Sequence, residues 1–169
     1  MRRVILLLLL SALVSQAGAD DGPRRVNPDY ETPHVVYDFY LDHPAKINAA
    51  LDWLRSLVNP LTAEPYSMAP DFMKIKVVIH GTEIVTVAKK NYAKYKRAVD
   101  RMRYYHQFGV EFKVCSLAAA DYGYEVEDFQ DFIDVVPSAF TELAHWQQQG
   151  YALIVPRVYE RTQSLDAIR

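Results

Sequence analysis

Two hydrophobic periods alternate along the chain and predict strands and helices in turn. Short runs rich in β-branched and aromatic residues are typical of strands. Such runs occupy residues 34–41, 74–80, 110–115, 133–136 and 151–155. Between them, apolar residues recur at the spacing of an amphipathic helix. The helices predicted in this way occupy residues 47–58, 91–108, 116–122 and 137–149.

Three local features define these predicted elements more closely. Asn59-Pro60 is expected to end the first helix, because proline cannot donate the helical hydrogen bond. In the last long helix, the face turned toward the sheet is predicted to carry Phe140, Leu143 and Ala144. Residues 82–90 are expected to form a polar connection.

Strands that alternate with helices through short connections predict an α/β fold with a mostly parallel five-stranded sheet and helices on both faces. This domain is expected to span residues 34–156. Residues 20–33 are rich in Asp, Pro and Arg and are expected to form an exposed N-terminal arm. Residues 157–169 form a polar tail, either frayed or a short docking helix.

The first residues have the pattern of a secretory signal. Arg2 and Arg3 precede an apolar run, and Ala17-Gly18-Ala19 matches the small-residue cleavage site. The alternative is an uncleaved membrane anchor, for which the run is short. Residues 1–19 are therefore predicted to be a signal peptide, and the mature chain is expected in the periplasm without membrane attachment.

Charge and motifs exclude several classes of function. Removal of the predicted signal moves the formal charge from −2 to −4, and the chain shows no nucleic-acid footprint. Basic residues between Lys89 and Arg103 recur along a helical pattern and indicate a solvated face. The chain has neither a Gly-x-Gly-x-x-Gly fingerprint nor a Walker lysine, so no nucleotide cofactor is expected.

Metal ligands are also missing from the pattern. No histidine pair has the spacing of a metal site, and a single cysteine rules out a Cys-x-x-Cys motif. The acidic run from Glu125 to Asp134 is interleaved with Phe129, Phe132 and Ile133, which favours a packed loop over a set of ligands. No metal or cofactor is therefore expected.

Cys115 is the strongest candidate for chemistry. It is the only cysteine of the chain and lies where a predicted strand runs into a helix-favouring segment. An unpaired cysteine in an exported chain is an inert buried thiol, an intermolecular link or a reactive group. A thiol at the start of a helix is favoured as the thiolate, which is the nucleophilic form.

His80 and Gly81 end another predicted strand, at the same edge of the sheet as Cys115. In an open α/β sheet, ligands bind outside the carboxyl ends of the strands. If the second and third strands flank the first, Cys115 and His80 share one crevice. His80 is either a packing residue or a group that orients a ligand or stabilises a thiolate. Tyr122 either lines this crevice or covers it.

Four blocks follow one another along the chain: Val77-Val-Ile-His80-Gly81, Gly109-Val-Glu-Phe-Lys-Val-Cys115, Val135-Val-Pro-Ser-Ala139 and Gln149-Gly-Tyr-Ala152. In this order they resemble the DsrE-like family of sulfur-relay proteins. The resemblance implies a flavodoxin-like sheet, homo- or hetero-oligomers, and a cysteine after the third strand that carries a persulfide. That cysteine matches Cys115, and His80 matches the His-Gly block. Well-understood members are cytoplasmic, whereas this chain has an export signal.

Two hypotheses follow from these residues. In the first, the chain is a periplasmic sulfur carrier or sulfurtransferase that holds a persulfide on Cys115 and exchanges it with a donor or acceptor protein. Ser116 and backbone N–H groups of the next helix would stabilise the anionic sulfur. In the second, the chain is an oligomeric binding or assembly module, and Cys115 is packed and inert.

Overall fold

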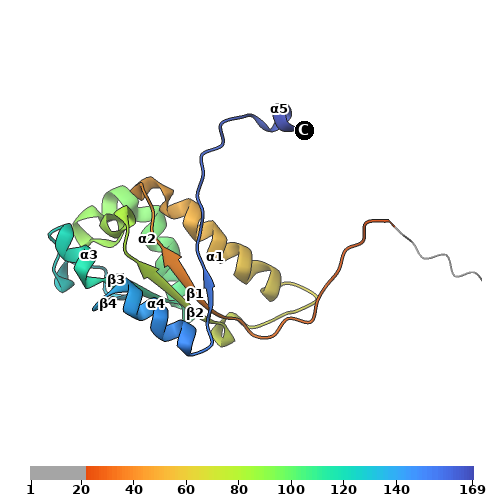
Figure 1. Cartoon of the computed structure of the whole chain (residues 1–169), viewed down its shortest axis with the longest axis horizontal. Coiled ribbons are helices and arrows are strands. Elements are labelled where there is room, and N and C mark those ends of the chain that lie inside the picture. Colours follow the sequence, from red (N-terminus) through yellow and green to blue (C-terminus); the bar gives the residue numbers. More distant parts are fainter. Residues whose placement is uncertain (1–21) are drawn as a thin grey trace, which may run out of the picture.

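A single five-stranded parallel sheet forms the centre of the computed structural model, which describes residues 22–169 (Figure 1). The predicted signal peptide lies outside these residues. The strands are β1 (His34–Phe39), β2 (Lys74–Ile79), β3 (Glu111–Cys115), β4 (Ile133–Val136) and β5 (Ala152–Ile154). Their order is β4-β3-β2-β1-β5, and every neighbouring pair is parallel. The predicted α/β sheet is therefore confirmed.

In the part of the chain that the structure describes, four α-helices connect the strands and a fifth lies in the C-terminal tail. They are α1 (Ile47–Thr62), α2 (Tyr92–His106), α3 (Ser116–Asp121), α4 (Ala139–Gln148) and α5 (Leu165–Ile168). Short 3-10 helices occupy Pro44–Lys46, Pro70–Phe72, Thr82–Val87, Lys89–Asn91 and Val126–Asp128. α1 and α2 lie against one face and α4 against the other (Figure 1). Each crossover between parallel strands thus supplies a helix to one face, as parallel pairing requires.

The two faces of the sheet differ in their chemistry. Under α1 and α2 the strands contribute a large apolar core that includes Tyr37, Phe39, Ile79 and Phe112. Under α4 the apolar cluster is small and is built from Val36, Val78, Cys115, Ala139 and Leu143. Successive residues of a strand point to opposite faces, so residues two apart along β3 share the face that carries Cys115.

Charged side chains fill the remainder of the face under α4. Lys76 pairs with Glu111, and its ammonium lies 4.5 Å from the centroid of the Trp146 ring. Lys113 lies 3.2 Å from a carboxylate oxygen of Asp134 on the neighbouring strand. The buried stems of the lysines cover apolar surface while their ammonium groups remain paired.

Helix α1 continues through Pro60, so the prediction that Asn59-Pro60 ends the helix is wrong. Pro60 lies only two residues before the end, where it removes a single helical hydrogen bond. Leu61 is buried in the core under α1, and its packing stabilises the last turn. Ala63 closes the helix by donating its backbone N–H to the carbonyl of Asn59.

The inner face of α4 also differs from the prediction. Phe140 is 75% exposed, whereas Ala139 and Leu143 are buried. The Ser138 hydroxyl accepts from the N–H of Phe140 and starts the helix there, which sets the buried stripe at Ala139 and Leu143. Phe140 is thereby turned to the carboxyl edge of the sheet.

The connection after β2 is not a polar loop. Residues Thr82–Val87 form a 3-10 helix in which Glu83, Ile84, Thr86 and Val87 are buried. Tertiary packing against the 3-10 helix Pro44–Lys46 and against α2 therefore covers a segment that its composition suggested would be exposed.

The C-terminal tail leaves the domain after β5 and projects away from it to α5 (Figure 1). All residues of α5 are exposed, and Ser164 accepts from the N–H of Ala167 to cap this one-turn helix. Within residues 22–169, no helix has the length and apolar character needed to cross a membrane.

Candidate functional site

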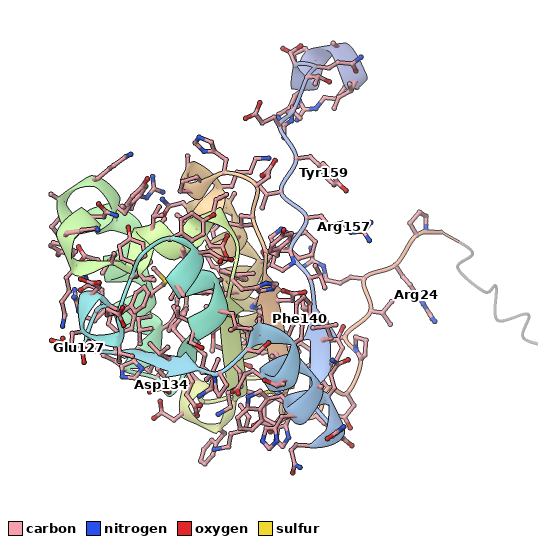
Figure 2. All side chains as sticks on the ribbon, turned by 60° about the vertical axis from the view of Figure 1, so that its left-hand side comes forward. Arg24, Glu127, Asp134, Phe140, Arg157 and Tyr159 are labelled. Carbon is pink, nitrogen blue, oxygen red and sulfur yellow. The ribbon has the colours of Figure 1, made fainter. Side chains whose placement is uncertain are left out.

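A cleft of about 1080 Å³ lies at the carboxyl edge of the sheet. Segments that follow all five strands line it. They contribute Asp38 and Tyr40 from β1 and its exit, His80 after β2, Cys115 from β3, Phe140 from α4 after β4, and Tyr159 from the tail after β5. Figure 2 shows Phe140 at the start of α4 and Arg157 and Tyr159 on the tail that rises from β5. The segments at the carboxyl ends of all five strands thus line the same cleft, as expected for a parallel α/β fold.

The register of the strands brings His80 beside Cys115. Ile79, the last residue of β2, is paired with Val114 of β3, so the residues that follow this pair are His80, directly after β2, and Cys115, the last residue of β3. The condition stated from the sequence, with the second and third strands flanking the first, is not what the structure shows. β3 lies next to β2, and the two site residues are neighbours for that reason.

Cys115 lies at the floor of the cleft. Its side chain is packed with Val36, Val78, Ala139 and Leu143, and the residue is 5% exposed. Within the described part of the chain, no hydrogen bond joins its thiol to His80. Cys115 is one of the residues that line the cleft.

His80 is held in a fixed orientation by three side chains. Its Nε2 lies 2.6 Å from Oδ1 of Asp38, and an ionised carboxylate only accepts, so Nε2 carries the donated proton. The Tyr40 ring stacks on the imidazole with centroids 4.9 Å apart. The edge of Phe140 meets it from another side at 5.7 Å. Asp38, Tyr40 and Phe140 therefore define one position for the imidazole.

Charges at the mouth of the cleft are partly compensated. Lys46 lies 2.8 Å from a carboxylate oxygen of Asp42, and the hydrogen bond between them lowers the pKa of Asp42. Among residues 22–169, no group of three His, Cys, Asp or Glu side chains is arranged to hold a metal ion.

Glu83 does not line the cleft, but it binds residues that do, and the sequence analysis missed it. It is fully buried, and its carboxylate accepts from the backbone N–H groups of Leu41, His80 and Gly81. Burial raises the pKa of Glu83 above its usual 4.5, against the effect of these hydrogen bonds. The available signal was one acidic residue before the apolar run Ile84-Val85, two positions after Gly81.

The residues predicted from the sequence have different places in the structure. Cys115, His80, Gly81 and Tyr122 line the cleft. Ser116 does not, because its hydroxyl donates to the carbonyl oxygen of Pro137 at 2.8 Å. Asp38, Tyr40 and Phe140 line the cleft without having been predicted as site residues.

The fold and the cleft define a class: a parallel five-stranded α/β protein with its site at the carboxyl edge of the sheet. A family model described as the DsrE/DsrF-like family matches residues 38–156. The chain therefore belongs to the DsrE/DsrF-like family, which links it to sulfur-relay functions.

Two solved structures are similar to the chain to different degrees. One, a protein of unknown function, MTH1491 from Methanobacterium thermoautotrophicum, has 21% sequence identity and a TM-score of 0.55 over 73% of this chain and 99% of that chain. The other, a conserved protein of unknown function, BT1422 from Bacteroides thetaiotaomicron, has 13% identity and a TM-score of 0.49 over 73% and 94% of the respective chains. No curated protein matches the chain. At 21% identity, the likeness to MTH1491 shows the fold alone.

Proposed function

We propose that the chain is an exported sulfur carrier that holds a persulfide on Cys115, and that it acts as a sulfurtransferase between a donor and an acceptor. The observation that carries this proposal is the position of Cys115 in a DsrE/DsrF-like chain. Cys115 lines the cleft at the carboxyl edge of the sheet, directly after the paired residues Ile79 and Val114. His80, which follows Ile79, lines the same cleft.

The proposed chemistry moves a sulfur atom without net oxidation. The Cys115 thiolate attacks the sulfane sulfur of a donor persulfide. A sulfur–sulfur bond to Cys115 forms, the donor's sulfur–sulfur bond breaks, and the donor leaves as a thiolate. An acceptor thiolate then attacks the terminal sulfur, and Cys115 returns to its starting form. The proton released when the Cys115 thiolate forms passes to a base in the cleft or to water, and Cys115 regains a proton once the acceptor has taken the sulfur.

Two polar groups are assigned different parts in this proposal. His80, fixed by Asp38, supplies an oriented imidazole in the same cleft for proton exchange with the reacting groups. The Ser116 hydroxyl is already donated to the carbonyl of Pro137 and has no second proton to offer an anionic sulfur. We therefore propose that groups lining the cleft, and not the Ser116 hydroxyl, stabilise the anionic sulfur of the persulfide.

We also propose a homo-oligomer in which the mouth of the cleft is part of the contact between copies. Six large apolar side chains that line the cleft are exposed: Tyr40, Leu117, Tyr122, Phe140, Val155 and Tyr159. Contiguous apolar surface of this kind marks interaction sites. Light scattering coupled to size exclusion should show a species larger than the monomer. Phe140→Ala should shift it toward the monomer, and a monomeric wild type refutes this part of the proposal.

The proposed compartment is the periplasm, because residues 1–19 have the pattern of a cleaved signal. The mass of the chain recovered from the periplasmic fraction should correspond to a mature form that begins at Asp20. Recovery of the intact chain from the cytoplasm would contradict this assignment.

A transfer assay tests the proposed activity. The protein is incubated with a low-molecular-weight persulfide and then with an excess of acceptor thiol, and the sulfur transferred is measured. Wild type should transfer sulfur faster than the uncatalysed mixture. Cys115→Ser should not, and equal rates for the two proteins would refute the proposal.

The burial of Cys115 favours a second candidate, a non-catalytic binding or assembly module that uses the same cleft. In that case Cys115 reacts with a small thiol reagent only after unfolding. Reaction in the native state, at a rate that exceeds the rate of global unfolding, supports the carrier. Reaction that requires unfolding supports the module.

A further inference from the structure

We infer that Glu83 is a positioning residue of the cleft, whose buried carboxylate joins the segment after β1 to the segment after β2 and so fixes His80 beside Cys115. Its effect on sulfur transfer rests on the proposed function, whereas its effect on the geometry of His80 does not.

The carboxylate is bound from two sides. Oε2 accepts from the N–H of Leu41 at 2.9 Å. Oε1 accepts from the N–H of Gly81 at 2.9 Å and from that of His80 at 3.2 Å. Leu41 follows β1, while His80 and Gly81 follow β2. One side chain therefore holds together two segments that are 39 or more positions apart in the sequence.

This contact continues the pairing of β1 and β2 beyond the sheet. The paired strands end at Phe39 and Ile79, and His80 still donates its N–H to the carbonyl of Phe39. Beyond that point, Glu83 and Thr82 connect the two segments. Glu83 accepts from the N–H of Leu41. Thr82 donates both its N–H and its hydroxyl to the carbonyl of Leu41. Tyr40 lies within the segment held in this way and stacks on His80.

Gly81 provides the space for the carboxylate. A Cβ at residue 81 would lie 2.6 Å from Oε2 of Glu83 and 2.5 Å from the backbone nitrogen of Leu41. The carboxylate thus occupies a position that only glycine at residue 81 leaves open.

The geometry requires a carboxylate and not simply a polar side chain. A buried charge is costly unless it is fully hydrogen-bonded. Both oxygens of Glu83 face backbone donors, and a carboxylate can accept at both. A glutamine amide has one oxygen and an NH₂ group that only donates, so one side of the contact would place two donors against each other. Glu83→Gln keeps the size and shape of the side chain but removes one of its two acceptor oxygens. It therefore tests whether acceptance at both oxygens is needed.

The test compares Glu83→Gln with Glu142→Gln. Glu142 is a partly buried glutamate of α4 that binds Trp146 Nε1 and does not line the cleft. In Glu83→Gln, NMR should show shifted amide protons for Leu41 and Gly81 and a shifted or lost Nε2–H signal of His80. The sulfur-transfer rate should fall about tenfold or more, because small misplacements of reacting groups have large effects on rate. Glu142→Gln should retain the three signals and the rate.

The inference is overturned if Glu83→Gln folds, retains the His80 Nε2–H signal and transfers sulfur within about twofold of wild type. If this variant does not fold, hydrogen exchange in the wild type decides, since the amides of Leu41 and Gly81 should be protected and rapid exchange overturns the inference. A wild type that does not transfer sulfur refutes the proposed function, and the NMR comparison then decides the role of Glu83 separately.

Discussion

Gly81→Ala is the substitution whose effect follows most directly from the geometry of the cleft. The added Cβ would lie 2.5 Å from the backbone nitrogen of Leu41, 2.8 Å from its carbonyl oxygen and 2.6 Å from Oε2 of Glu83. The φ of −100° at Gly81 is open to any residue, so the penalty is steric and does not come from backbone strain.

The neighbours of this Cβ are fixed by their own hydrogen bonds. The N–H of Leu41 donates to Glu83, and its carbonyl accepts from Thr82 at 2.9 Å. Overpacking of a rigid site costs about 1–3 kcal/mol. For a chain of this length, each kcal/mol lowers Tm by about 2–4 °C, so Gly81→Ala should lower Tm by about 2–12 °C.

Urea unfolding and thermal melting measure this loss, and Gly150→Ala is the control. A Cβ at residue 150 meets no atom within 4 Å, but its φ of +84° imposes backbone strain. Both variants should lose stability. Only Gly81→Ala should shift the NMR signals of Leu41 and His80. If Gly81→Ala has the wild-type midpoint and unchanged signals, the steric argument is refuted.

Three further substitutions give independent checks. Leu54→Ala removes a fully buried side chain of α1 and should cost about 2–5 kcal/mol in urea unfolding, with a loss below about 1 kcal/mol contradicting the assigned core. Asp38→Ala removes the charged partner of His80 and should cost about 1.5–3 kcal/mol, and unchanged stability would mean that this pair is not formed. Burial raises the pKa of Glu83 above 4.5, so its protonated form favours the folded state. The stability linked to this proton is therefore full below about pH 4.5 and is lost as pH rises through the raised pKa, so wild type should lose stability relative to Glu83→Gln over that interval. Above it, the ionised carboxylate still accepts from Leu41, His80 and Gly81. A difference that stays constant with pH would contradict this shift.

Local patterns were enough to predict the strands, the parallel α/β fold and the positions of Cys115 and His80. Both residues stand at strand ends, and strand ends are visible in the alternation of apolar runs and breakers. The end of α1 and the buried face of α4 were predicted wrongly, and both errors have structural causes. Burial of Leu61 carries α1 through Pro60, and the Ser138 cap turns Phe140 outward.

The surroundings of His80 were not visible in the sequence, because they depend on strand order. Asp38 and Tyr40 reach His80 only because β1 lies beside β2. Phe140 reaches it across the sheet from α4, 60 positions later in the chain. Glu83 accepts hydrogen bonds from the segments that follow β1 and β2. A single buried acidic residue produces no periodic pattern in the sequence, so its burial could not be predicted.

The most direct test of the central claim is site-resolved mass spectrometry of the protein after incubation with a sulfane-sulfur donor. The account predicts that wild type gains one sulfur atom, that the gain maps to the peptide containing Cys115, and that a reducing thiol removes it. Cys115→Ser should gain none. A wild type that remains unmodified, or a gain that persists in Cys115→Ser, would contradict the account.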